Sequence, residues 1–480
     1  MNAAGVLGEL ERQGVKATSL AIDSRHVTAG DIFVAMPGHR VDGRTFVADA
    51  VARGADAVIY QAGTPLSLQV PAVAVDDLAA LAGEIAHLVY GKPSEQLWLA
   101  GVTGTNGKTS VSQWIAQALT AVGCPCAVVG TLGSGFPNHL TESVNTTPDA
   151  VSLHRELAGF VGQGAVACAM EVSSIGIDEG RVNGVGFDAA VFTNLTRDHL
   201  EYHGDMEAYA AAKERLFEWP GLSAAVVNLD DPLGARLAAK LAGRVNTVGY
   251  TLEGSTGGDR VLAARDIAMS GAGLAFTVDG VRFEAPVVGH FNVANLLAVI
   301  GALLVGDETL ADIAEALRGI EPPPGRMQAV GGDGLPLVVV DYAHTPDALD
   351  KALAALRHVA ETREGRLVCV FGCGGDRDPG KRPLMGAVAE RLADRVLLTS
   401  DNPRNEDALA IIETIAKGMS RRPEIEPDRE SAIRRAVREA AAGDVILVAG
   451  KGHEPYQEIA GVRRPFSDLA LARETLELRT

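Results

Sequence analysis

The sequence predicts an α/β protein of three domains, each built around its own sheet. The chain has 480 residues, which at roughly 100–200 residues per domain is enough for about three. Short apolar runs alternate with helical patterns, which predicts mostly parallel sheets covered by helices on both faces. Gly91-Lys92-Pro93 and Glu321-Pro-Pro-Pro-Gly325 interrupt this rhythm. We therefore predict domains at residues 1–92, 93–325 and 326–480.

Composition and charge exclude several classes of protein. A net charge of −18 argues against nucleic acid as a partner, because binding to phosphate backbones needs a basic surface. A few cations in one pocket can still bind a phosphorylated small molecule. The five cysteines lack disulfide or zinc spacing. No apolar run approaches the roughly 18 residues of a membrane span, and no export signal is visible. We expect a cytoplasmic monomer with no membrane insertion.

The first two segments show distinct strand patterns. Residues 1–92 carry β-like runs at 31–35, 57–60 and 72–75. The second segment opens with a buried-strand pattern at 97–102, a glycine-rich turn and a helix over about 108–122. Further strand-like runs lie at 126–129, 165–170, 189–192 and 224–227. Short alternating runs with a turn at Asp279–Gly280 predict a small antiparallel patch over residues 260–289.

The third segment repeats the strand–helix rhythm, which predicts a Rossmann-like domain. The strand-like runs are 337–340, 367–371, 395–399 and 445–449, and the helical patterns are 347–360, 406–419 and 430–441. Each strand ends in a polar or glycine-rich loop, at 341–344, 372–378, 400–404 and 450–454. Because open α/β sheets bind ligands beyond the carboxyl ends of their strands, these four loops predict a binding site.

A glycine-rich motif follows the strand pattern at 97–102 and opens a helix: Gly101-Val-Thr-Gly104-Thr-Asn-Gly107-Lys108-Thr109. Glycines let backbone N–H groups approach phosphate oxygens, and the helix N-terminus favours negative charge. Lys108 can reach the terminal phosphates of ATP, and Thr109 can offer its hydroxyl to Mg²⁺. The motif departs from the general pattern, because Val102 stands where the first glycine belongs. We predict ATP and Mg²⁺ as ligands.

The phosphate loop, read from Thr103 to Thr109, resembles that of the Mur ligase family and of its relatives, the folylpolyglutamate synthetases. The resemblance implies an ATP-dependent ligase that joins a carboxylate to an amine. It extends over the full chain, motif by motif. It implies nucleotide contacts at Gly104, Thr105, Asn106, Gly107, Lys108, Thr109, Ser110, Asn292, Asn295, Arg326 and Asp341.

Glu171 and His199 both follow apolar strand patterns. A carboxylate and an imidazole near a phosphate loop suit a divalent ion shared with ATP. The resemblance implies that both bind Mg²⁺ beside Thr109, and that Lys213 is carbamoylated and completes this catalytic set with Lys108. Carbamoylation needs a free amine, so burial or nearby cations must lower the pKa of Lys213. Without the resemblance, a surface lysine on a helix would be the simpler interpretation.

The third domain is predicted to select the amine. Asp401-Asn-Pro-Arg404 is similar to the signature of the diaminopimelate-adding branch of the family. Diaminopimelate carries an amino-acid head group at each end, so the distal end needs a cation for its carboxylate and an anion for its ammonium. Arginine can bind the carboxylate bidentately and Glu454 can pair with the ammonium. The residues implied are Arg377, Asp401, Asn402, Pro403, Arg404, Gly450 and Glu454.

Motifs of the first two domains resemble those that hold the UDP-muramoyl dipeptide. The residues implied are Ser24, His39, Asn145, Thr146, Thr147, Ser173, Glu179 and Arg181. Two positions depart from the family: Ile175 stands where His is usual, and Glu179 where Gln is frequent. The alternatives are a lysine-adding Mur ligase, a folylpolyglutamate synthetase-like ligase and a nucleotide sensor without ligase chemistry. Arg404 opposes lysine, the UDP-type motifs oppose folate, and a sensor would not need Glu171, His199 and Lys213 together.

Overall fold

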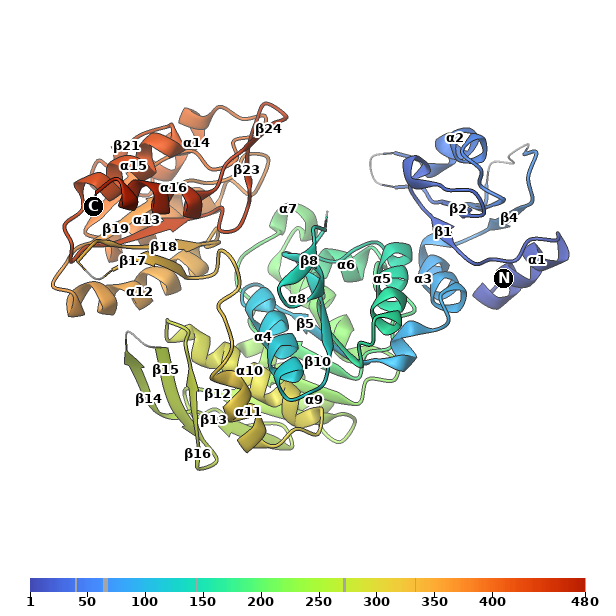
Figure 1. Ribbon diagram of the computed structural model, residues 1–480, viewed down its shortest axis with the longest axis horizontal. Coiled ribbons are helices and arrows are strands. Elements are labelled where there is room, and N and C mark those ends of the chain that lie inside the picture. Colours follow the sequence, from blue (N-terminus) through green and yellow to red (C-terminus); the bar gives the residue numbers. More distant parts are fainter. Residues whose placement is uncertain (39–40, 64–67, 144, 271–272, 333, 480) are drawn as a thin grey trace.

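The computed structural model describes residues 1–38, 41–63, 68–143, 145–270, 273–332 and 334–479. Three α/β bodies follow one another along the chain, each around its own sheet (Figure 1). The predicted fold class is confirmed: a small N-terminal body, a central body with a mostly parallel sheet and a C-terminal body with a second parallel sheet. Within the described part of the chain, every helix is too short or too polar to traverse a bilayer.

The N-terminal body has a four-stranded parallel sheet in the order β1-β2-β3-β4. Alternate residues of β2 enter separate cores on the two faces, Val34 on one and Phe33 on the other. The elements are α1 (Ala3–Arg12), β1 (Leu20–Ala21), η1 (Ser24–His26), β2 (Ile32–Ala35), η2 (Gly43–Phe46), α2 (Val47–Ala52), β3 (Ala57–Gln61), β4 (Ala72–Val75) and α3 (Leu78–Val89).

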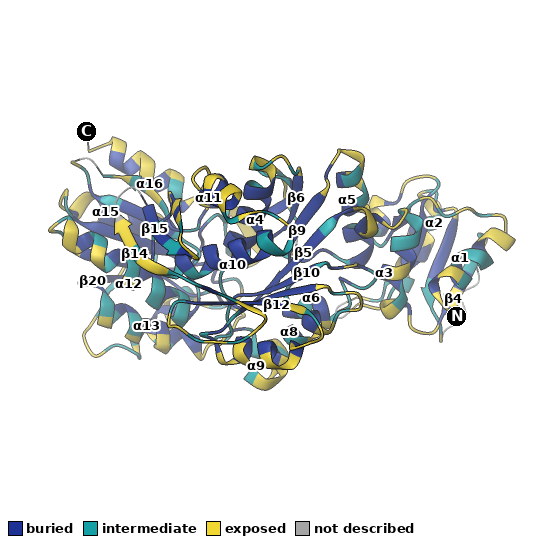
Figure 2. Cartoon of the chain, turned by 90° about the horizontal axis from the view of Figure 1, so that it is seen from below, coloured by how far each residue is buried: buried dark blue, intermediate teal, exposed yellow. Residues whose placement is uncertain are grey.

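The central body has a nine-stranded sheet in the order β13-β12-β11-β10-β5-β9-β6-β7-β8, parallel up to β6 and antiparallel beyond it. Buried side chains of α4, α10 and α11 cover one face and those of α5 and α9 the other, so the inner strands β6, β9 and β10 are dark blue in Figure 2. The strands are β5 (Trp98–Thr103), β6 (Cys126–Gly130), β7 (Gly133–Phe136), β8 (His139–Thr141), β9 (Ala167–Glu171), β10 (Ala189–Phe192), β11 (Ala224–Asn228), β12 (Asn246–Thr251) and β13 (Arg260–Ala263). The helices are η3 (Pro93–Gln96), α4 (Lys108–Ala121), α5 (Ala150–Gly162), α6 (Ser174–Asp178), α7 (Leu200–His203), α8 (Met206–Glu214), η4 (Arg215–Glu218), α9 (Pro232–Leu241), α10 (Phe291–Val305) and α11 (Leu310–Leu317).

The predicted antiparallel patch is present but shorter than expected. It consists of β14 (Arg265–Ser270), β15 (Gly273–Val278) and β16 (Val281–Ala285). Its expected first strand, β13, instead extends the main sheet, pairing in parallel with β12. Only Leu262 of β13 is fully buried, which is typical of an edge strand. An edge strand and a strand of a small hairpin have the same alternation of buried and exposed residues, so the sequence did not distinguish them.

The C-terminal body has a six-stranded sheet in the order β17-β18-β22-β19-β20-β21, parallel except for β17. A β23–β24 hairpin that the sequence did not indicate follows it. The strands are β17 (Gln328–Gly331), β18 (Leu337–Asp341), β19 (Leu367–Phe371), β20 (Arg395–Leu398), β21 (Glu424–Ile425), β22 (Val445–Ala449), β23 (Tyr456–Ile459) and β24 (Val462–Pro465). The helices are α12 (Pro346–Thr362), α13 (Lys381–Leu392), α14 (Ala408–Ala416), α15 (Arg429–Glu439) and α16 (Asp468–Glu477).

Candidate functional site

One cleft of about 2090 Å³ is lined by residues of the central and C-terminal bodies. The four polar loops at the carboxyl ends of β18, β19, β20 and β22 all contribute to it, as predicted. The predicted site residues that line it are Thr105, Asn106, Gly107, Lys108, Thr109, Ser110, Asn145, Thr146, Glu171, Ser173, Arg181, His199, Asn292, Asn295, Arg326, Asp341, Arg377, Asp401, Asn402, Arg404, Gly450 and Glu454.

The remaining predicted residues lie outside this lining. Gly104 belongs to the phosphate loop itself, and the buried Lys213 donates to its carbonyl group. Ser24 is buried in η1 of the N-terminal body. The position His39 lies outside the described residues. Thr147 and Glu179 both contact Arg181, which lines the cleft, and Pro403 stands between the lining residues Asn402 and Arg404.

Two glycines shape the phosphate loop between β5 and α4. Both have a positive φ, 147° at Gly104 and 89° at Gly107. A Cβ at Gly104 would lie 1.9 Å from the Thr193 hydroxyl, and one at Gly107 would lie 2.5 Å from Asn295 Oδ1. No side chain caps the N-terminus of α4. The loop can therefore follow this path only with glycine, and the first N–H groups of α4 stay free for an anion.

Two lysines meet at the same carbonyl group. Lys108 donates to Gly104 O and Thr105 O, each at 2.9 Å, and Lys213 donates to Gly104 O at 2.9 Å. Lys213 is 1% exposed and lies 4.3 Å above the centre of the Tyr209 ring. Burial, followed by the charge of Lys108, lowers the pKa of Lys213 well below its ordinary value. Burial and a nearby cation, either of which would favour carbamoylation, are therefore both present at Lys213.

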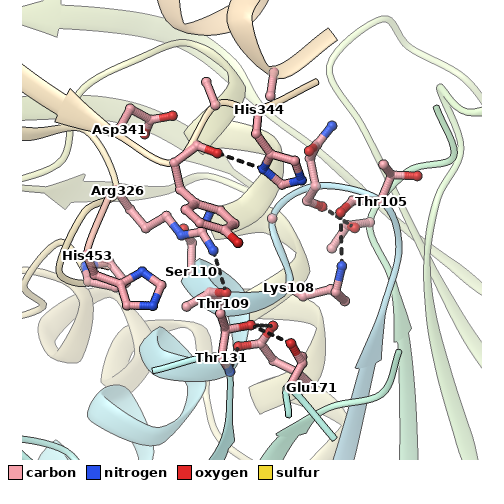
Figure 3. A pocket seen from close by; sticks show the side chains of 18 of the residues that line it. Thr105, Lys108, Thr109, Ser110, Thr131, Glu171, Arg326, Asp341, His344 and His453 are labelled. Carbon is pink, nitrogen blue, oxygen red and sulfur yellow. Dashed lines mark hydrogen bonds between the residues drawn. The ribbon is translucent and has the colours of Figure 1, made fainter. Parts of the chain in front are cut away.

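The nucleotide end of the cleft joins the two bodies (Figure 3). Arg326 donates to the Thr109 hydroxyl at 3.0 Å, and its guanidinium lies 4.5 Å from the centre of the Tyr342 ring. Asn106 donates to Asp347 Oδ2 at 2.9 Å. Asp341 accepts from the N–H group of Met327 at 2.7 Å, and burial raises its pKa. The predicted nucleotide residues of both bodies therefore share one site.

Asn292 and Asn295 lie in the first turn of α10. Asn295 donates to Asn292 Oδ1 at 2.8 Å, and Asn292 donates to the Val288 carbonyl at 2.7 Å. Asn295 also packs against the phosphate loop at Gly107. The pair therefore connects this helix to the nucleotide end of the cleft.

Glu171 ends β9 as a buried carboxylate, 1% exposed, below Lys108 and Thr109 in Figure 3. It accepts from the N–H group of Thr131 at 2.8 Å and from the Thr131 hydroxyl at 3.0 Å. Among the described residues no group of three or more His, Cys, Asp or Glu side chains could hold a metal ion alone. One carboxylate and one hydroxyl do fit Mg²⁺ that takes its other ligands from water and phosphate oxygens.

His199 lines the cleft but is not in contact with Glu171. It has a positive φ of 53° and precedes α7. Its ring nitrogens lie 3.5 Å from Asp198 Oδ2 and 3.8 Å from Glu201 Oε1. Asp198 also lies 3.7 Å from His344 Nε2 of the C-terminal body. Burial raises the pKa of Asp198, but His344, His199 and Lys381 outweigh it, so this carboxylate stays ionised.

The amino-acid end of the cleft is a network of charged side chains. Asn402 donates to Glu454 Oε2 at 2.7 Å, and Lys451 donates to Asn402 Oδ1 and Glu454 Oε2, each at 3.0 Å. Arg404 has a positive φ of 51° and donates to Gly375 O at 2.7 Å. Arg377 is exposed at the cleft and makes no hydrogen bond or ion pair with another described residue. Asp401, Glu454, Arg377 and Arg404 therefore all line this end of the cleft.

A third group comprises the residues of the central body that the sequence predicted for the precursor. The hydroxyls of Thr131 and Thr146 are 3.1 Å apart, and Thr147 donates to Ser173 Oγ at 3.1 Å. Arg181 donates to the Thr147 carbonyl at 3.0 Å and forms an ion pair with Glu179. Glu179, which departs from the family pattern, therefore pairs with an arginine that lines the cleft. Ile175, the other departure, lines the cleft itself.

Three family models match successive parts of the chain. They are described as "Mur ligase family, catalytic domain" at residues 16–90, "Mur ligase middle domain" at 102–303 and "Mur ligase, glutamate ligase domain" at 325–452. UDP-N-acetylmuramoyl-L-alanyl-D-glutamate–2,6-diaminopimelate ligases from Chromobacterium violaceum and Pseudomonas aeruginosa are 51% and 52% identical to it. These alignments cover 97% and 95% of this chain and 96% and 94% of the relatives. The chain belongs to the Mur ligase family.

A solved structure supports the same assignment. A UDP-N-acetylmuramoyl-L-alanyl-D-glutamate–2,6-diaminopimelate ligase is 38% identical, with a TM-score of 0.67 over 97% of this chain and 95% of that chain. The protein is therefore an ATP-dependent ligase that forms amide bonds between small molecules.

In this Mur ligase, sequence reasoning missed several residues of the site. Thr131 lies in a loop whose composition carries no signal, and Asp198 was given no role although it directly precedes the predicted His199. Lys451 belongs to the predicted loop 450–454, yet its contacts with Asn402 and Glu454 could not be foreseen without the fold. His344 belongs to the 341–344 loop, and only the meeting of two bodies places it beside Asp198.

Proposed function

We propose that this Mur ligase joins 2,6-diaminopimelate to UDP-N-acetylmuramoyl-L-alanyl-D-glutamate, with hydrolysis of ATP, in peptidoglycan biosynthesis. The observation that carries the proposal is one continuous cleft lined by Lys108 of the phosphate loop and by Arg404 and Glu454. Relatives that are 51% and 52% identical over nearly the whole chain are named for this activity. A zwitterionic amine and a nucleotide can therefore be bound side by side.

Recognition of diaminopimelate rests on opposite charges at the amino-acid end. Arg404 and Arg377 would bind the distal carboxylate, with Asp401, Asn402, Pro403 and Gly450 shaping its surroundings. Glu454 would pair with the distal ammonium in place of Lys451, its present partner. Lysine lacks the distal carboxylate, so an enzyme that adds lysine would gain nothing from a positioned arginine.

The reaction divides into two steps. The D-glutamyl carboxylate attacks the γ-phosphorus of ATP, forming a carboxyl–phosphate bond and releasing ADP. The amine then attacks that carbonyl, forms the amide and expels phosphate, while the amine loses a proton. Lys108 would leave its two loop carbonyls and bind the transferring phosphoryl group. Positioning and charge neutralisation supply most of the acceleration in such transfers.

Magnesium would be held by Glu171, Thr109 and His199, and it would neutralise charge on the phosphates. We further propose that Lys213 carries a carbamate. Its neutral amine would attack CO₂, forming an N–C bond and releasing one proton. The buried site and the adjacent Lys108 both favour the neutral amine, and the product would give this region an anion.

The carbamate is tested with enzyme depleted of CO₂. We expect activity to fall on depletion and to return with bicarbonate, and we expect Lys213→Ala to be inactive in either buffer. The exposed Lys16→Ala serves as the control for the substitution. Activity that ignores bicarbonate, together with an active Lys213→Ala, would rule out the carbamate.

We also propose that residues 1–92 bind the UDP portion of the precursor, residues 93–325 bind ATP and residues 326–480 bind diaminopimelate. Ser24, His39, Asn145, Thr146, Thr147, Ser173, Glu179 and Arg181 would hold the precursor. One chain supplies both sides of the nucleotide site, which supports a monomer. Its use of ATP supports a cytoplasmic location. Light scattering during gel filtration, with all three substrates present, tests the monomer.

The central experiment compares amino acids. ADP release is measured with the UDP-muramoyl dipeptide and either diaminopimelate or lysine, each over a range of concentrations. We expect kcat/KM for diaminopimelate to exceed that for lysine by at least about 100-fold, because lysine would leave the arginine site unpaired. Equal rates, or a preference for lysine, would refute the proposal. ADP release that ignores every acceptor would favour a nucleotide sensor.

A further inference from the structure

Arg429 and Asp468 form an ion pair that is sealed from solvent. Arg429 is the first residue of α15 and Asp468 the first of α16, and both side chains are 0% exposed. The contact is bidentate: Nε donates to Oδ1 at 2.8 Å and Nη2 donates to Oδ2 at 2.7 Å. The carboxylate therefore fixes the plane of the guanidinium.

The remaining contacts of Arg429 go to the bases of two loops. Nη1 donates to the Ser400 carbonyl at 3.2 Å, and Nη2 donates to the Ala449 carbonyl at 3.0 Å. Ser400 begins the loop 400–404 and directly precedes its predicted substrate residues 401–404, and Ala449 directly precedes the loop 450–454. One guanidinium thus holds together the starting points of both loops at the amino-acid end of the cleft.

Arg429 also responds to the charges of those loops. Burial lowers its pKa, but Asp468 first, and then Asp401 and Glu454, outweigh this effect and raise it. The buried cation is therefore close enough to Asp401 and Glu454 for an electrostatic effect, although its hydrogen bonds go elsewhere.

Stability alone is a poor explanation for such a pair. Replacing a buried ion pair with apolar residues of similar volume is often neutral or stabilising, because the desolvation of two charges offsets their attraction. An apolar pair cannot, however, donate to two carbonyl groups at once. A planar guanidinium, oriented by a carboxylate, can do so in a fixed geometry.

We propose that Arg429, held by Asp468, is a positioning residue for the amine substrate. Arg429 sets the spacing of the loops 401–404 and 450–454. This inference rests on the proposed function, because it assumes that these loops bind diaminopimelate. Arg429 acts through the backbone of the loops and does not touch the substrate. Its loss should therefore affect the binding of the amine and leave the nucleotide end unchanged.

The test is the double variant Arg429→Met/Asp468→Leu, which removes both charges together. We expect a folded protein whose KM for diaminopimelate rises about 10- to 100-fold, while the KM values for ATP and the precursor stay within about twofold. The matched control is Arg434→Met/Glu474→Leu. That pair also joins α15 to α16, at 3.0 Å, but is partly exposed and does not contact either loop. The control should retain all three KM values.

Arg429→Lys provides a second measurement if the double variant does not fold. It keeps a positive charge for Asp468 but cannot reach both carbonyls, so the KM for diaminopimelate should rise here too. An unchanged KM for diaminopimelate in either folded variant, or a proportional change in all three KM values, would overturn the positioning role. If the wild-type enzyme itself does not use diaminopimelate, the proposed function fails instead.

Discussion

The two ends of the cleft are built in different ways. At the nucleotide end, seven consecutive residues, 103–109, supply two glycines, a free helix N-terminus and one lysine. At the amino-acid end, Arg404 and the network of Asn402, Lys451 and Glu454 lie in two loops, and the carbonyl groups at the bases of both loops accept from the buried Arg429. These residues come from two loops and a helix spread over residues 402–454.

The difference follows from what each end has to bind. A phosphate group is recognised by backbone N–H groups, which one short loop can present in any protein. A second zwitterion needs charges of both signs at fixed separations, and unpaired charges cannot be left buried. At the amino-acid end Lys451 pairs with Glu454 and Arg429 pairs with Asp468, whereas Lys108 at the nucleotide end rests on two neutral carbonyl groups.

The largest expected effect is at the nucleotide end. Lys108→Ala should lower kcat by about 10²- to 10³-fold, because one charged donor to the transferring phosphoryl group is lost. The KM for diaminopimelate should change little, since Lys108 does not contact that end. Steady-state ADP release over a range of each substrate measures both effects.

The exposed Lys16→Ala is the control for Lys108 and should behave as wild type. If Lys108→Ala keeps more than about a tenth of wild-type kcat, the loop does not act on the transferring group. A large rise in the KM for diaminopimelate would show that the two ends are less independent than the contacts indicate.

A smaller and more selective effect is expected from Arg404→Asn. Asparagine tolerates the positive φ of 51° at this position, so the backbone should keep its path. The loss of charge-assisted hydrogen bonds should lower kcat/KM for diaminopimelate by about 10- to 100-fold and leave the low rate with lysine unchanged. The exposed Arg422→Asn is the control. Equal losses with both amino acids would mean that Arg404 maintains the loop rather than binding the distal carboxylate.

The same contrast explains what could be predicted from the sequence. The phosphate loop is a contiguous pattern, so its glycines, Lys108 and the strand–helix context were readable, and the fold class followed from the alternation of strands and helices. The pair Arg429–Asp468 is separated by 39 residues, and neither residue belongs to a motif. Two arginines and two acids in amphipathic helices look alike in sequence, and only burial distinguishes this pair from Arg434 and Glu474.

Edges and contacts between bodies were equally hard to predict. β13 was expected in the antiparallel patch because an edge strand and a hairpin strand share one alternation pattern, and only pairing with β12 distinguishes them. The contact of Asp198 with His344 depends on how two bodies meet.

The smallest expected effect concerns His453, which lines the cleft beside Arg326 in Figure 3. Its Nδ1 is buried without a hydrogen-bond partner among the described residues. Burial, followed by Arg326 and Lys451, lowers the pKa of His453 to about 4 from an ordinary value of 6.5. The folded state thus favours neutral histidine, and below about pH 6.5 the unfolded chain takes up the proton first.

The contribution of His453 to stability is therefore complete above about pH 6.5 and is lost as the pH falls toward 4. Allowing for its partial exposure, we expect the free energy of unfolding to fall by about 1 kcal/mol between pH 7 and pH 5 through this residue. Urea unfolding of the wild type and of His453→Asn measures it, with the exposed His26→Asn as the control. His154 is buried with a pKa lowered to about 4, but it is present in all three proteins, so the difference isolates His453. Identical pH dependence in all three would show that the His453 imidazole is solvated in the folded protein.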